Sequence, residues 1–123
     1  MDNYIMLKNL TRDLIEDTKT ASTRFEQVKQ TREKGDFYTE VKPFADAVKQ
    51  KNVQWKQAAA VWIREQQPKN LHYRQIETTA ENIEMVSIQA FFPETSLKRF
   101  INHVQSINYV LKSVLQHLEN SED

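Results

Sequence analysis

Cysteine is absent from this chain of 123 residues. That absence excludes disulfides, thiolate zinc sites, iron–sulfur clusters and a cysteine nucleophile. Glycine occurs once, at Gly35, although a typical chain contains about 7% glycine. The phosphate-binding loops GxGxxG and GxxxxGK[ST], and the Gly-x-Ser-x-Gly elbow of hydrolases, are therefore excluded. Because β-hairpins depend on turn glycines, the single glycine also favours helices over sheet.

The chain also lacks long apolar runs and an excess of charge. Its longest apolar stretch covers residues 58–63, whereas a membrane-spanning helix needs about 20 residues. Residues 1–10 contain Asp2 and no apolar run, which is not the pattern of a signal peptide. Seventeen basic residues balance seventeen acidic ones, whereas nucleic-acid binders carry a basic excess. We therefore expect a cytoplasmic protein with neither a membrane nor a nucleic acid as its partner.

Apolar residues recur at helical spacing in segments that Gly35, Pro68 and Pro93 separate. These segments are 1–34, 36–67, 69–92 and 94–123. The last segment shows the clearest stripe, with alternating spacings of three and four residues. Its members are Leu97, Phe100, Val104, Ile107, Leu111, Val114 and Leu118. Because short connections join helical segments, sequential neighbours should run antiparallel. The sequence therefore predicts one all-α domain over residues 1–123, an antiparallel up-down four-helix bundle.

Details of the segment ends are also predicted. In the first segment, Thr18 interrupts the apolar stripe. Gly35 follows the last cations of that segment and should end its helix. Asp36 can cap the next helix, and Pro43 should kink or split that helix near residues 41–42. Thr95 or Ser96 is the expected cap of the last helix.

The two tryptophans, Trp55 and Trp62, lie seven residues apart on one helical face. We interpret both as core residues.

No metal-binding or catalytic constellation is recognisable. The Glu-x-x-His pattern that di-iron bundles require does not occur. His103 and His117 share a heptad column, but their separation of roughly 21 Å along a helix prevents them from sharing an ion. We therefore predict no metal, no cofactor and no catalytic residue, and a protein that is not an enzyme.

Two short clusters could contact a ligand or partner. Lys98 and Arg99 fall in the first turn of the last helix, where the helix dipole disfavours cations. Either a nearby carboxylate neutralises them, or this end binds an anion or an acidic partner. Lys69 and His72 lie in the turn before the third helix, where His72 either satisfies backbone groups or contacts a ligand. In an up-down bundle the two clusters fall at opposite ends.

Several short motifs, in this order and spacing, resemble the YppE-like family of small bacterial proteins of unknown function. They are Asp36-Phe37, Lys42-Pro43, Trp55, Pro68-Lys69-Asn70-Leu71-His72, Gln75-Ile76-Glu77 and Lys98-Arg99-Phe100. The resemblance covers nearly the whole chain. It implies an all-α, bundle-like fold in a cytoplasmic protein and supplies no activity, cofactor or catalytic residue.

Two functional hypotheses remain. The first is a non-enzymatic interaction or structural module, which acts through an unidentified protein partner or through self-association. The second is a bundle that binds a small molecule or an anion through Lys98 and Arg99, or through Lys69 and His72.

Overall fold

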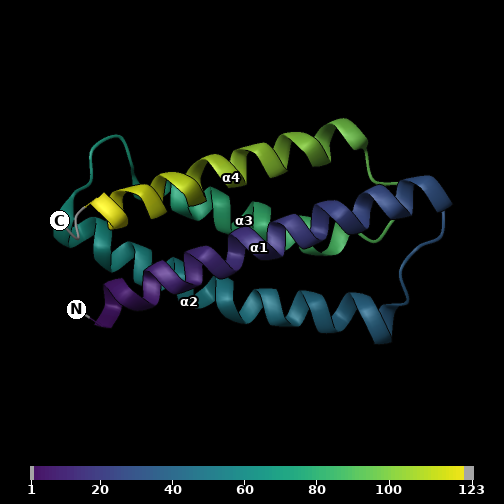
Figure 1. Cartoon of the computed structure of the whole chain (residues 1–123), viewed down its shortest axis with the longest axis horizontal. Coiled ribbons are helices and arrows are strands. Elements are labelled where there is room, and N and C mark those ends of the chain that lie inside the picture. Colours follow the sequence, from purple (N-terminus) through teal and green to yellow (C-terminus); the bar gives the residue numbers. More distant parts are fainter. Residues whose placement is uncertain (1, 121–123) are drawn as a thin grey trace.

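The computed structural model describes residues 2–120, which form four α-helices and one short π-helix and contain no strand. The elements are α1 (Asp2–Thr31), η1 (Phe37–Val41), α2 (Lys42–Gln66), α3 (Tyr73–Gln89) and α4 (Leu97–Asn120). Successive helices run in opposite directions (Figure 1). The predicted antiparallel four-helix bundle is therefore confirmed.

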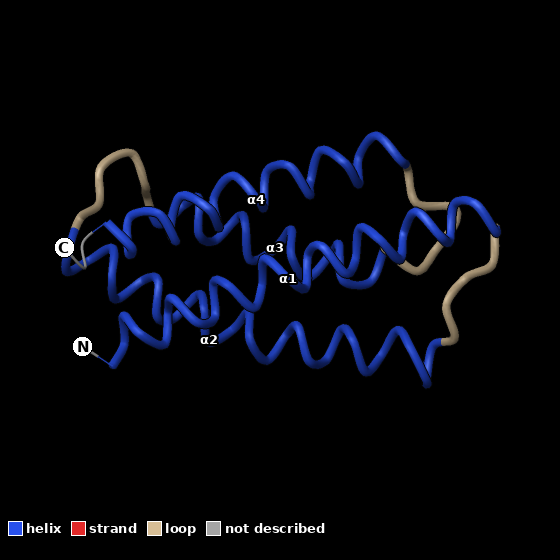
Figure 2. Tube along the Cα trace, viewed as in Figure 1, coloured by secondary structure: helices blue, strands red, loops and turns tan. Residues whose placement is uncertain are grey.

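The connections define the two ends of the bundle (Figure 2). Connections 32–36 and 90–96 lie together at what we call the distal end. Connection 67–72 lies at the opposite, proximal end, beside the start of α1 and the end of α4. No helix of the described residues is long and apolar enough to cross a membrane.

Each of α1 and α3 packs against both α2 and α4, so that α2 and α4 lie diagonally across the bundle. Both tryptophans are buried in the shared core, which confirms the prediction made for them. Trp55 is completely buried, and its indole N–H donates to Thr11 Oγ1 at 3.0 Å. The Thr11 hydroxyl in turn donates to the Leu7 carbonyl at 2.7 Å. The polar groups of this deeply buried pair are therefore satisfied.

The structure corrects two expectations about the apolar stripes. Thr18 does not interrupt the stripe of α1, because it is buried and its hydroxyl donates to the Leu14 carbonyl at 2.8 Å. Conversely, Leu97 belongs to the stripe of α4 by spacing but is 54% exposed, and Val104 is only half-buried. Near the start of α4, the bundle leaves a groove beside α1 instead of closing over these side chains.

The role of Gly35 also differs from the prediction. The helix α1 ends at Thr31, and Arg32, with φ 61°, takes the left-handed conformation that often terminates helices. Gly35 has no positive φ. Its N–H donates to the Phe91 carbonyl at 2.9 Å, and a Cβ at Gly35 would lie 2.9 Å from Phe91 Cδ1. Close packing against Phe91, rather than helix termination, therefore explains this glycine.

The predicted break near residues 41–42 is the junction between η1 and α2. In η1 the Val41 N–H donates to the Asp36 carbonyl, and the Lys42 N–H donates to the Phe37 carbonyl, which are π-type spacings. Pro43 then occupies the first turn of α2, where a missing N–H costs little. The proline therefore starts the α-helix rather than kinking its interior.

We expect Gly35→Ala to destabilise the protein by about 1–3 kcal/mol, because the added methyl group must displace Phe91. Urea unfolding measures this change. Lys34→Ala, in the same connection and exposed, is the control and should stay within about 0.5 kcal/mol of wild type. If Gly35 contributed only flexibility, alanine would instead stabilise the fold by about 0.4–1 kcal/mol.

Candidate functional site

The two predicted clusters lie at opposite ends of the bundle. Lys69 and His72 belong to the proximal connection, and Lys98 and Arg99 belong to the first turn of α4 at the distal end (Figure 1). All four side chains are exposed. The structure therefore does not combine them into one site, as the up-down topology predicted.

His72 marks the start of α3. Its backbone is extended, its N–H donates to Gln75 Oε1 at 2.7 Å, and the Gln75 N–H donates to the His72 carbonyl at 3.0 Å. Asn70, two residues earlier, adopts a left-handed φ of 62°. These contacts organise the turn and the helix start.

The start of α4 is capped by Ser96, one of the two residues predicted for this role. Ser96 Oγ accepts a hydrogen bond from the Arg99 N–H at 3.3 Å, and the Ser96 carbonyl accepts from the Phe100 N–H at 3.0 Å. The first turn of α4 contains no acidic residue. Within residues 2–120, neither Lys98 nor Arg99 forms an ion pair with a carboxylate. Two exposed cations therefore remain at the positive end of the helix dipole.

A groove of about 280 Å³, which we call the distal groove, opens between α1 and the first turns of α4. The rings of Phe25 and Phe100 stack at its floor, with centroids 4.1 Å apart. Leu97 is 54% exposed and Ile101 is 43% exposed at its rim. The full lining consists of Ser22, Phe25, Glu26, Leu97, Phe100, Ile101, Val104 and Gln105. The groove is therefore mainly apolar, with one carboxylate in its α1 wall.

Two further cations lie at the end of this groove nearest the distal connections, which we call its distal mouth. Lys29 Nζ lies 5.4 Å from the centroid of the Phe25 ring and donates to the Pro93 carbonyl at 2.9 Å. Arg32 Nη1 donates to the same carbonyl at 3.2 Å. Because this shared acceptor is a neutral peptide group, it does not cancel either charge.

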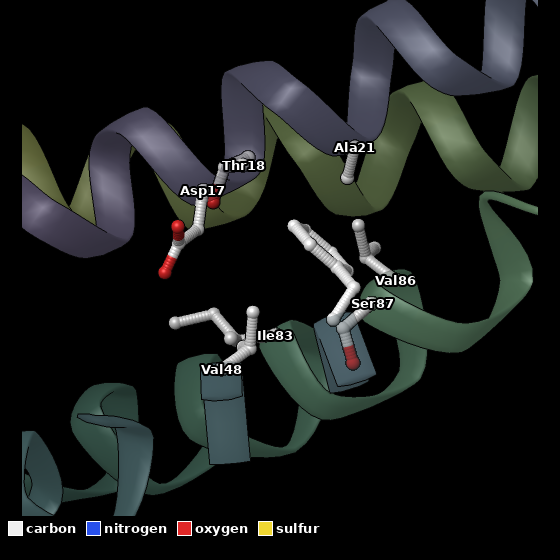
Figure 3. A pocket seen from close by; sticks show the side chains of 8 residues that line it. Asp17, Thr18, Ala21, Val48, Ile83, Val86 and Ser87 are labelled. Atoms are coloured by element: carbon white, nitrogen blue, oxygen red, sulfur yellow. The ribbon is translucent and has the colours of Figure 1, made fainter. Parts of the chain in front are cut away.

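A second hollow lies inside the bundle, where α1, α2 and α3 meet (Figure 3). Figure 3 shows Asp17 and Thr18 of α1 facing Val48 and Ile83 across it. Its volume of about 10 Å³ is close to that of a single water probe. Asp17 Oδ2 accepts a hydrogen bond from Lys51 Nζ at 2.8 Å. This cavity is too small for an organic ligand.

Metal-binding geometry is not found in the described part of the chain. Residues 2–120 contain no group of three or more His, Asp or Glu side chains that could hold an ion. Asn52 Oδ1 and His103 Nδ1 are buried atoms without a hydrogen-bond partner there. They do not belong to a common ligand set.

The η1 turn presents two exposed aromatic rings on a well-anchored backbone. Phe37 and Tyr38 are 54% and 78% exposed, and their rings meet edge to face at 5.1 Å. Asp36 Oδ1 accepts hydrogen bonds from the Thr39 N–H and hydroxyl, both at 2.9 Å. These bonds lower the pKa of Asp36 below its ordinary value.

Glu40 provides the second anchor of this turn. Its two carboxylate oxygens accept hydrogen bonds from Nε and Nη2 of Arg24 on α1. This bidentate pairing lowers the pKa of Glu40, and burial opposes that shift. The turn is therefore attached to α1 through a charged pair as well as through its packing.

The sequence analysis missed the distal groove, because it counted Leu97 and Val104 as members of one apolar stripe on the basis of their spacing. One available signal was the small residue Ser22, which occupies the α1 wall where a larger apolar residue would fill the space. Sequence spacing by itself does not show which residue of α1 faces which residue of α4.

Comparisons with known proteins agree on one family. A family model described as a bacterial domain of unknown function (DUF1798) matches residues 11–118. The chain is 24% identical over 116 residues to the uncharacterised protein YppE of Bacillus subtilis, with 94% of each chain covered. These matches confirm the YppE-like resemblance.

Solved structures show the same fold. A protein of unknown function from Listeria innocua matches with a TM-score of 0.92 and 25% identity, covering 98% of this chain and 96% of that one. A DUF1798 domain from Staphylococcus aureus matches with a TM-score of 0.84 and 28% identity, covering 91% and 95%. The crystal structure of YppE gives a TM-score of 0.89, covering 94% of each chain.

The lowered pKa values of Asp36 and Glu40 predict an acid-sensitive stability. Because both groups have lower pKa values in the folded state, their contribution is complete at neutral pH and is lost as the pH falls below roughly 4. Glu40→Gln should lower the free energy of unfolding at neutral pH and flatten its decrease in acid. Urea unfolding across this pH range measures both effects.

Arg24→Gln is the matched variant for this experiment, because it removes the other half of the ion pair. The double variant should cost little more than either single variant at neutral pH. Strictly additive losses, or an acid dependence that Glu40→Gln leaves unchanged, would contradict the assignment.

Proposed function

We propose that this chain, which belongs to the bacterial family DUF1798 of unassigned function, is a cytoplasmic, non-enzymatic interaction module. Its partner is a protein that places an amphipathic helix in the distal groove. The observation that carries this proposal is the exposure of Leu97 and Ile101 above a floor of stacked phenylalanines.

The groove has the chemistry of a helix-binding surface. Leu97, Ile101 and Val104 follow a spacing of four and three residues, so that they form one stripe along α4. Antiparallel α1 supplies the facing wall through Ser22 and Phe25. Apolar grooves between packed helices accept the apolar face of a further helix. Contiguous exposed apolar surface is characteristic of interaction sites.

Other features support the remaining parts of this proposal. The absence of cysteine agrees with a reducing compartment. The inner cavity has room for about one water molecule, whereas the distal groove has a volume of about 280 Å³ and a floor of stacked phenylalanines. Self-association through the same groove is the competing mode, and light scattering distinguishes it by giving twice the mass of the chain.

Fluorescence anisotropy with a labelled amphipathic peptide tests the groove. The peptide is roughly 18 residues or five turns long, with a Leu/Ala face and glutamine at the other positions. We expect it to bind the wild-type chain. Leu97→Ser and Ile101→Ser should each weaken binding roughly tenfold, because each removes an apolar side chain worth about 1.5–3 kcal/mol when buried.

Val53→Ser is the control for this experiment. Val53 is an aliphatic residue on α2 with 47% exposure, close to that of Ile101, and it lies outside the distal groove. The proposal fails if the wild-type chain does not bind the peptide. It also fails if Val53→Ser weakens binding as much as the groove variants do.

Anion binding at Lys98 and Arg99 is the second candidate function, and the lack of a carboxylate partner for either cation within residues 2–120 supports it. Phosphate or a nucleotide at 100 times its Kd should stabilise the fold by about 2.7 kcal/mol. A thermal-shift series measures this, and the variant K98A/R99A should abolish the shift.

K69A/H72A is the parallel variant for the proximal cluster. If the proximal cluster is the anion site, this variant rather than K98A/R99A should abolish the shift. A melting temperature that phosphate and nucleotides leave unchanged would remove support from both clusters.

A further inference from the structure

We propose that the helix bound in the distal groove is acidic, with carboxylates that face the lysine-bearing rim of α4. This inference rests on the proposed function above and specifies the chemistry of its partner. The argument depends on how the charges of α4 and of the distal mouth are distributed around the apolar groove.

The exposed charge of α4 is predominantly positive. Within Leu97–Asn120 the cations are Lys98, Arg99 and Lys112, and the acidic residue is Glu119. Glu119 is already paired with Arg12 of α1 at 3.0 Å. None of the three cations has a carboxylate partner within residues 2–120.

Two of these cations share a helical stripe with a residue that lines the groove. Lys98, Gln105 and Lys112 are spaced seven residues apart, so they form one stripe along the helix. All three are exposed, and Gln105 lines the distal groove. The α4 face that borders the groove at Gln105 therefore carries a lysine about two turns before and about two turns after that residue.

The distal mouth continues this positive edge. Lys29 and Arg32 both donate to the neutral Pro93 carbonyl, and neither forms an ion pair with a carboxylate of residues 2–120. By contrast, Arg24, Lys42 and Lys51 elsewhere in the bundle each have a carboxylate oxygen within 3.0 Å. The cations beside the groove thus remain available to an incoming anionic group.

The acidic residues near the groove determine how the partner lies in it. Glu26 is the charged residue of the α1 wall, and Glu33 and Glu94 lie in the two distal connections. The field across the groove is therefore asymmetric, positive along the α4 rim and negative at Glu26. A partner helix with carboxylates facing α4 and a neutral or basic residue facing Glu26 complements both walls.

Three amphipathic peptides test this inference by fluorescence anisotropy. They share one Leu/Ala face and carry glutamate, glutamine or lysine at the flanking positions. The glutamate peptide should bind about fivefold more tightly than the glutamine peptide, because exposed ion pairs contribute up to about 1 kcal/mol each. Raising the ionic strength to about 1 M, where the Debye length is 3 Å, should remove this difference.

The variant K98E/R99E should weaken binding of the glutamate peptide roughly tenfold and leave binding of the glutamine peptide unchanged. We expect this variant to fold, because glutamates in the first turn of a helix interact favourably with the helix dipole. Lys49→Glu, an exposed position on α2 outside the groove, is the control and should leave all three affinities unchanged.

The outcomes separate this inference from the proposed function. Equal binding of the glutamate and glutamine peptides overturns the acidic partner but leaves the groove as a helix-binding site. If the lysine peptide binds most tightly, the inference is overturned, and Glu26 rather than the α4 cations determines the charge of the partner. A single-stranded oligo-dT that binds as tightly as the glutamate peptide, and loses binding in K98E/R99E, overturns a protein partner. Failure of all three peptides to bind the wild-type chain overturns the proposed function as well.

Discussion

Burial of the Trp55 side chain is the central constraint of this bundle. The indole is completely buried, and its N–H is satisfied by the Thr11 hydroxyl, which donates onward to the Leu7 carbonyl. An indole N–H without a partner would cost about 1–3 kcal/mol in such a place. The hydrogen bond therefore favours one register of α2 against α1. The remaining apolar stripes pack in the arrangement that this register sets. In it, α1 and α3 each contact both α2 and α4.

The distal end combines firmly packed segments with an open surface. The 32–36 connection is held by the backbone bond from Gly35 to Phe91, and the η1 turn is held by the pairing of Glu40 with Arg24. The neighbouring start of α4 leaves Leu97 exposed beside the groove. A rigid scaffold next to an open apolar groove loses little conformational freedom when a partner binds.

Charge is distributed unevenly over a molecule whose formal net charge is zero. Lys42 and Lys51 are paired with carboxylates, whereas Lys98 and Arg99 are not paired within residues 2–120. Bulk composition averages these two situations, so it argues against nucleic-acid binding in general and gives no information about one groove. The local arrangement of charge supports the acidic partner that we propose.

Helical periodicity, the positions of Gly35, Pro68 and Pro93, and the short connections were sufficient to predict the four helices, their antiparallel order and the burial of Trp55 and Trp62. Burying one apolar face per helix leaves few other arrangements. Pro43 likewise located the start of the α-helical part of its segment, since a missing N–H is tolerated in a first turn.

Only the tertiary structure decided that Leu97 lies at an open groove and that Gly35 is needed for its contact with Phe91. Both depend on which residues of distant segments face each other. Side-chain spacing within one helix does not determine that pairing, because it is set by how the assembled helices pack.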